Sequence, residues 1–263
     1  MKMKKAIGLV LAIASIACFA ACDNVDSSSP MPSPEGIIGE RVTREEFAKI
    51  SSMCCDNFYT QSVTVQPLTT IGNYQMGFTE TENAYYCGNL IYVEINKDVL
   101  WKVTTTDSET GETKVVESSY VEEYKYYFEK DGDRYYSYTY NESKDAWVKG
   151  ENSYIETRFS YGNLNTFGET FGVDFSEEYA YFCNFDNWTY LEETGEYQLL
   201  NFQFTYGDYT TSISENVAFK DGHIVQISFS YNGGTSWTIS KYSNHGQSAV
   251  TLPTNIIDNS VAE

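Results

Sequence analysis

The segment Asp221-Gly222-His223-Ile224-Val225-Gln226-Ile227-Ser228-Phe229 carries the pattern that decides the fold class. Apolar and polar residues alternate after Ile224 with a period of two, which is typical of a β-strand with one buried face. The Asp-Gly pair before it favours a tight hairpin turn, because both residues tolerate positive φ angles. The segment therefore predicts a strand that follows a hairpin in an antiparallel sheet.

The same two signals recur along most of the chain. Ser62–Gln66 and Tyr92–Ile95 alternate in the same way, and the residues around them are rich in Val, Ile, Thr, Tyr and Phe. Further turn signals stand at Thr110-Gly111, Asp131-Gly132, Thr194-Gly195 and Asn232-Gly233-Gly234. Consecutive hairpins predict an antiparallel meander, and 23 tyrosines and 15 phenylalanines predict that its side chains are bulky.

Two stretches outside the strand pattern have helical signals. Thr43-Arg44-Glu45-Glu46 is a capping box, and Phe47, Ile50 and Met53 follow it on one helical face, so we expect a short helix from about Arg44 to Met53. Residues 151–185 contain a second capping pattern, but glycines interrupt any longer helix. This segment predicts a short helix and irregular cover over the sheet.

The first residues have the pattern of an export signal. Three lysines precede an apolar stretch, and Phe19-Ala20-Ala21-Cys22 resembles the lipobox of bacterial lipoproteins, although Phe19 stands where leucine is usual. The resemblance implies cleavage after residue 21 and lipidation of Cys22, with Cys18 as the alternative. We therefore expect a signal peptide at 1–21, an anchor and polar tether at 22–41, one domain at 42–254 and a tail at 255–263.

The net charge of the chain indicates which classes of partner it can bind. The signal contains three basic residues and no acidic one, so 14 basic and 37 acidic residues remain, a net charge of −23. Such a domain repels phosphate backbones, and nucleic-acid binding is excluded on that ground. We expect an extracytoplasmic protein that is held on the cell membrane by its covalent lipid, not by its own surface charge.

Four cysteines remain after the two in the signal region: Cys54, Cys55, Cys87 and Cys183. Disulfides persist outside the cytoplasm, and the even number allows two bridges. Cys54 and Cys55 are adjacent, so each is expected to pair with Cys87 or Cys183, and the spacing does not decide between these pairings. A four-thiolate zinc site is the alternative, although the sequence has no C-x-x-C pair.

The sequence contains no catalytic or cofactor motif. Nucleophile elbows, H-E-x-x-H, Walker loops and dinucleotide fingerprints are all missing. Asp131-Gly132-Asp133 lacks the distant glutamate of a calcium loop, and the two histidines, His223 and His245, are expected to be surface residues beside turns. We therefore expect a protein without enzymatic activity, cofactor or metal.

The order of these parts resembles a known superfamily. Val42-Thr43-Arg44-Glu45-Glu46-Phe47, the hairpin Phe219–Ile224, and Tyr242–Gly246 leading to Val250–Pro253 are similar to motifs of uncharacterised lipoproteins of low-GC Gram-positive bacteria. Those lipoproteins resemble the LolA/LolB and LppX/LprG superfamily. The resemblance implies a mainly β (α+β) fold: a strongly curved antiparallel half-barrel with one or more short helices over its concave face.

Two functions follow from these observations. The resemblance implies that the space between sheet and helices binds or carries a lipid-like amphipathic ligand. The candidate lining residues, each equally suited to a core, are Phe47, Ile50, Phe159, Phe167 and Phe171. The alternative is a surface adhesion or glycan-binding module in which exposed aromatics such as Trp147 and Trp188 stack on sugars.

Overall fold

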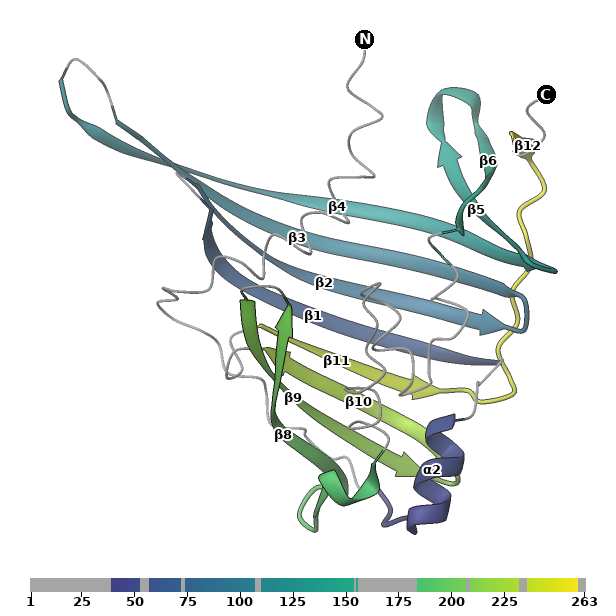
Figure 1. Cartoon of the computed structure of the whole chain (residues 1–263). Helices are drawn as coiled ribbons and strands as arrows, with labels where there is room; N and C mark the ends of the chain where they lie inside the picture. Colours follow the sequence, from purple (N-terminus) through teal and green to yellow (C-terminus); the bar gives the residue numbers. More distant parts are fainter. Residues whose placement is uncertain are drawn as a thin grey trace.

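A computed structural model shows one open sheet of twelve strands (Figure 1). It describes residues 39–52, 57–71, 74–106, 110–153, 155, 184–206, 209–231 and 236–259. The sheet is twisted and bent, as expected when bulky side chains crowd strands that already have an intrinsic right-handed twist. The predictions of a mainly β fold and of a largely antiparallel sheet are therefore confirmed.

The strands follow one another as a meander with one long return. Their order across the sheet is β12-β6-β5-β4-β3-β2-β1-β11-β10-β9-β8-β7. All neighbours are antiparallel except β12 and β6, which are parallel. The strands are β1 (Asn57–Ile71), β2 (Tyr74–Cys87), β3 (Leu90–Thr106), β4 (Thr113–Asp131), β5 (Arg134–Asn141), β6 (Ala146–Glu151), β7 (Thr189–Leu191), β8 (Glu196–Tyr206), β9 (Tyr209–Lys220), β10 (His223–Tyr231), β11 (Ser236–Ser243) and β12 (Ile256–Asp258).

Most predicted turns are found where the sequence places them. Gly111, Gly132, Gly195 and Gly222 all have positive φ angles at turns between consecutive strands. Gly195 has a second reason to be glycine, because a Cβ atom there would lie 2.3 Å from the backbone oxygen of Gly39. The turn predicted at residues 232–234 lies outside the described residues.

The predicted helix is present as α2 (Arg44–Ser52). Its capping box is formed as expected: the Glu46 amide donates to the Thr43 hydroxyl at 3.2 Å, and the Thr43 amide donates to the Glu46 carboxylate at 2.7 Å. Phe47 is fully buried on the apolar side of the helix. The helix packs near β10 and the short 3-10 helix η4 (Phe185–Asn187).

The prediction about helical cover needs a correction. The described part of the chain contains one α-helix, α2, which lies at one end of β9 and β10 and does not cover the sheet (Figure 1). The reason is its length, because nine residues span only about 14 Å whereas the neighbouring strands are longer. Most of residues 151–185, the other predicted cover, lie outside the described residues.

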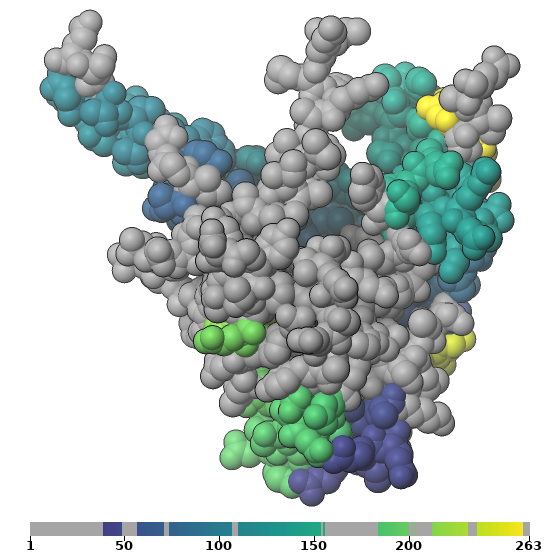
Figure 2. All heavy atoms as spheres, in the orientation of Figure 1, coloured from purple at the N-terminus to yellow at the C-terminus, as the bar shows by residue number. Residues whose placement is uncertain are grey.

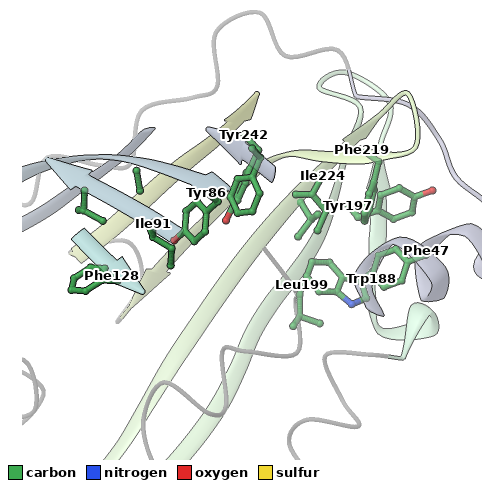
Figure 3. Packing of buried hydrophobic residues seen from close by; sticks show 14 of the residues in the cluster. Phe47, Tyr86, Ile91, Phe128, Trp188, Tyr197, Leu199, Phe219, Ile224 and Tyr242 are labelled. Carbon is green, nitrogen blue, oxygen red and sulfur yellow. The ribbon is translucent and has the colours of Figure 1, made fainter. Parts of the chain in front are cut away.

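The core lies on one face of the sheet, which we call the inner face. Phe58 on β1, Tyr86 on β2, Ile91 on β3 and Phe128 on β4 stand opposite one another in register. Phe58 and Tyr86 stack with their ring centroids 4.2 Å apart. Figure 3 shows this row continuing toward β8–β10, where further buried residues join it. They are Phe47, Trp188, Tyr197, Leu199, Val217, Phe219, Ile224 and Tyr242.

The middle of the same face is polar. The hydroxyls of Ser62 and Ser240 lie 2.8 Å apart, and those of Thr64 and Thr238 lie 3.0 Å apart, across the β1–β11 pair. Glu215 of β9 is also buried on this face. Apolar packing therefore holds one end of the sheet, and paired hydroxyls hold its centre.

Candidate functional site

A row of tyrosines crosses five neighbouring strands on the opposite, outer face. The row consists of Tyr59 (β1), Tyr85 (β2), Tyr92 (β3), Tyr127 (β4) and Tyr138 (β5), and each is directly opposite the next in the strand register. We call it the outer tyrosine row. Because direct cross-strand neighbours have their Cβ atoms about 5 Å apart, the rings of the first four tyrosines, Tyr59 to Tyr127, come into contact.

The rings pack against one another along the sheet. Centroid distances are 4.8 Å between Tyr59 and Tyr85, 6.1 Å between Tyr85 and Tyr92, and 4.6 Å between Tyr92 and Tyr127. All four of these side chains are half-buried, whereas Tyr138 is fully buried. The ring faces are therefore largely shared within the row, and the outward-pointing parts are ring edges and hydroxyl groups.

A tryptophan on the next strand, β6, adjoins the row. Trp147 of β6 is half-buried and meets Tyr127 edge to face, with centroids 4.9 Å apart. Its other neighbour is Tyr140 of β5, at 5.5 Å, which is 44% exposed. The backbone of Trp147 is held from both sides: it pairs with Tyr140, and its N–H donates a hydrogen bond to the Asn255 carbonyl oxygen at 2.8 Å. At this end of the row, Tyr140 exposes a large aromatic surface to the solvent.

Two carboxylates lie beside the outer tyrosine row. Glu94 accepts hydrogen bonds from the Tyr92 hydroxyl at 2.7 Å and pairs with Lys125 at 3.2 Å. Glu129 accepts from the Tyr138 hydroxyl and from the Lys149 ammonium, the latter at 2.8 Å. Each carboxylate therefore sits between a tyrosine and a lysine.

These contacts set the protonation states. The Tyr92 hydroxyl and then the Lys125 ammonium lower the pKa of Glu94. Burial acts to raise the pKa of Glu129, but the bonds from Lys149 and Tyr138 outweigh it and lower that pKa. Burial, and next the bond to Glu129, raise the pKa of Tyr138 to about 12. At neutral pH the row thus combines protonated phenols with ionised carboxylates.

The arrangement suits binding by hydrogen bonds. Within the described residues the hydroxyls of Tyr85 and Tyr127 have no protein partner, so each can donate and accept outward. The carboxylates of Glu94 and Glu129 supply further acceptor positions beside them. Such a surface matches ligands that carry many hydroxyl groups.

The residues predicted to line a lipid site are only partly described. Phe47 is fully buried, and its ring contacts those of Phe185, Trp188, Tyr197 and Phe219 at 5.3–5.7 Å (Figure 3). The Ile50 side chain and Phe159, Phe167 and Phe171 lie outside the described residues. The role of these five residues as ligand lining stays a prediction.

The two tryptophans named as glycan contacts have different positions. Trp188 is 7% exposed and belongs to the inner core, so the expectation that it is exposed was wrong. A tryptophan beside polar residues was interpreted as a surface residue, yet the turn of η4 directs it under α2. Trp147 is half-buried at the end of the outer tyrosine row.

Among the cysteines and histidines, the structure describes Cys87, His223 and His245. Cys87 is half-buried and accepts a hydrogen bond from the Asn57 amide at 3.7 Å, while Cys54, Cys55, Cys183 and the lipidation site Cys22 lie outside the described residues. The disulfide pairing stays a prediction. His223 and His245 were expected to be surface residues, but both are half-buried. Their rings stack at 4.2 Å because the chain returns beside β10 after β11.

Sequence reasoning missed the outer tyrosine row, although a signal for it exists. Tyr127 and Tyr138 stand at nearly equal distances from the predicted Asp131-Gly132 turn, as Tyr85 and Tyr92 do from Gly88. Residues equally far from a tight turn become cross-strand partners. Counting outward from each turn would therefore have paired these tyrosines.

Comparison with known proteins gives little support for an assignment. No family model matches the chain, and no curated protein matches it. Among solved structures it is similar to a beta-barrel-like protein of the domain of unknown function DUF1849 from Brucella abortus, with 7% identity and a TM-score of 0.18 over 71% of this chain and 96% of that one. A likeness this weak carries no argument about function. The resemblance to the LolA/LolB and LppX/LprG superfamily is supported only as far as a large, mostly antiparallel sheet.

In the described part of the chain, no helix is both long enough and apolar enough to cross a membrane.

Proposed function

We propose that this chain is an extracytoplasmic lipoprotein, anchored through Cys22, that binds neutral glycans without catalysis at the outer tyrosine row. The observation that carries the proposal is the end of the row, where half-buried Trp147 and exposed Tyr140 adjoin a line of tyrosine hydroxyls. Aromatic side chains with a polar group offer an apolar ring to a sugar face and a hydrogen-bonding partner to its hydroxyls.

The rigidity of the row favours binding. Its residues stand on five paired strands, and Trp147 is held on β6 between β5 and β12. Binding to such a surface immobilises few additional side chains of the protein, so the loss of conformational entropy on association is small. An extended chain of sugars can contact several strands at once, since neighbouring strands are about 4.8 Å apart.

Charge narrows the class of ligand to neutral glycans. The mature chain has a net charge of −23, and Glu94 and Glu129 lie beside the row, where they accept hydrogen bonds from its tyrosines. Anionic polysaccharides are repelled by such a surface at low ionic strength. Neutral polysaccharides are not repelled by this charge, and their hydroxyl groups can donate hydrogen bonds to the carboxylates.

Two observations favour the glycan hypothesis over lipid carriage. Phe47, the one described side chain among the candidate lining residues, is enclosed by four aromatic rings of the core. The centre of the inner face is lined by hydroxyl pairs such as Ser62 with Ser240, and buried hydroxyls do not favour an acyl chain. Both features make the outer face the better supported site.

The test is binding of the full chain to immobilised neutral polysaccharides, laminarin, xylan and dextran, with hyaluronate as an anionic comparison. We expect saturable binding to at least one neutral polymer, and a loss of about tenfold or more in affinity in Trp147→Ala, which corresponds to about 1.4 kcal/mol. The matched control is Tyr74→Ala, since Tyr74 is 40% exposed but stands on the inner face of β2. Its affinity should equal that of the unaltered chain. Equal losses in both variants, or binding to none of the neutral polymers, would refute the proposal.

A further inference from the structure

The long strand β4 has an edge that its neighbour covers only in part. β5 pairs with residues Tyr126–Asp131 of β4, whereas on that side no described strand pairs with Thr113–Lys125. On the other side, β3 pairs with Thr113–Glu129 of β4, nearly the whole strand. Figure 1 shows the far ends of β3 and β4 extending away from the other strands, and Figure 2 shows that they project from the body of the molecule.

This edge is unusual in its side chains. Free strand edges are normally shortened, bulged or protected by charge, because their unpaired backbone groups pair readily with another chain. Here four large apolar side chains are exposed within a stretch of seven residues: Val115 (59%), Val116 (40%), Tyr120 (45%) and Val121 (59%). Exposed apolar residues beside an unpaired edge mark a site of strand addition.

We propose that residues Thr113–Glu123 of this edge pair with the same residues of a second copy of this chain, antiparallel, about a twofold axis at Ser118. A twofold axis perpendicular to the sheet places inner-face residues beside inner-face residues. Side chains alternate along a strand, so even-numbered residues then meet even-numbered residues of the other copy. The possible registers are therefore those in which the residue numbers of two facing residues add up to an even number.

Charge and hydrophobicity select one of these registers. With the axis at Ser118, Lys114 stands opposite Glu122 of the other copy. Because of the twofold symmetry, the dimer contains two such ion pairs. On the outer face, Val115 stands opposite Val121. Opposite charges and β-branched residues in direct cross-strand positions both stabilise an antiparallel pair.

The neighbouring registers are unfavourable. An axis at Glu117 would place the Glu117 carboxylate of one chain opposite the Glu117 carboxylate of the other, and like charges in that position are destabilising. An axis at Ser119 would place Val116 opposite Glu122 and Val115 opposite Glu123. The sequence of the edge is thus complementary to itself in one register.

The dimer would extend the sheet and would leave both outer tyrosine rows on the same side, because the axis is perpendicular to the sheet. The pairing does not depend on what the rows bind. It uses only residues of the β4 edge.

The test is zero-length carbodiimide cross-linking of the full chain, which joins a lysine amine to a carboxylate only when the two are in contact. Lys114 and Glu122 lie eight residues apart on one strand, about 27 Å, so one chain cannot link them. We expect a linked peptide that contains both residues, in a species with twice the mass of the chain. A linked peptide found only at the mass of one chain, or no Lys114–Glu122 link at all, would overturn the proposal.

Charge exchange tests the register. In sedimentation equilibrium of the full chain in density-matched detergent, we expect a dimer, its dissociation in Lys114→Glu, and its recovery in Lys114→Glu with Glu122→Lys. Lys144→Glu is the control, since it makes the same charge change at an exposed site away from the edge. A monomeric unaltered chain, or a single Lys114→Glu variant that stays as dimeric as Lys144→Glu, would contradict the inference.

Discussion

Replacing Glu215 by Gln should stabilise the fold at neutral pH. Glu215 stands on the inner face of β9, opposite Leu199 of β8 and Phe229 of β10, and is 3% exposed. No hydrogen-bond partner reaches its Oε2 atom in the described part of the chain. Burial alone raises the pKa of this carboxyl from its ordinary value of 4.5 to about 8.

The magnitude follows from the difference between folded and unfolded states. A group whose pKa is raised on folding contributes stability that is fully present below the unfolded pKa and is lost as the pH rises through the folded pKa. At pH 7 the unfolded chain gains from ionising Glu215 while the folded chain keeps it neutral. With a pKa of about 8 in the fold, the free energy of unfolding is reduced at pH 7 by about 3 kcal/mol. This is a large part of the 5–15 kcal/mol typical of a domain.

Glutamine has nearly the same shape and no ionisable group. In urea unfolding of the full chain, we expect the difference in unfolding free energy between Glu215→Gln and the unaltered chain to grow by about 2 to 3 kcal/mol from pH 5 to pH 7. Taking the difference removes every other titrating group. Glu123→Gln, at an exposed position of β4, should give a difference that barely changes with pH. A constant difference for Glu215→Gln as well would refute the reasoning, because it would mean that Glu215 is ionised in the fold.

Three further predictions concern the core and its pH dependence. Phe47→Ala should lower the free energy of unfolding by about 3 to 5 kcal/mol, since it leaves a cavity among four rings; a urea midpoint close to that of the unaltered chain would contradict this. Tyr197→Phe keeps the ring but removes the hydroxyl that accepts from the Val42 amide and donates to its oxygen, both at 2.8 Å, so calorimetry should show a loss of about 1 to 3 kcal/mol. Burial and the nearby charge of His223 lower the pKa of His245 from 6.5, so the stability present above pH 6.5 falls as the pH drops through the lower, folded pKa. His245→Gln should flatten this part of the stability profile measured from pH 7 to pH 5.

Local signals in the sequence were sufficient for the start of α2 and for several of the turns. The capping box at Thr43 and Glu46 predicted where α2 begins, because its two hydrogen bonds join residues three apart. Asp131-Gly132 and Asp221-Gly222 predicted turns, because few residues other than glycine accept a positive φ angle. Such signals depend on neighbours along the chain and not on the rest of the fold.

The candidate site was predicted less well for the opposite reason. Trp188 and Trp147 both lie near polar residues in the sequence, yet one is buried under α2 and the other ends the outer tyrosine row. Burial depends on which distant segment covers a residue, and no local pattern contains that information. The unpaired edge of β4 was equally inaccessible to sequence reasoning, because it follows from where β5 stops pairing.

The sequence by itself determined an acidic, mainly β chain with hairpin turns and one capped helix, since composition, periodicity and short motifs are properties of neighbouring residues. The tertiary structure alone decided that β1 lies between β2 and β11, that five tyrosines form one row, and that Glu215 is enclosed by apolar partners. Those features join residues up to about 180 positions apart, and the free energy that selects them comes from packing across the whole sheet, not from any single segment.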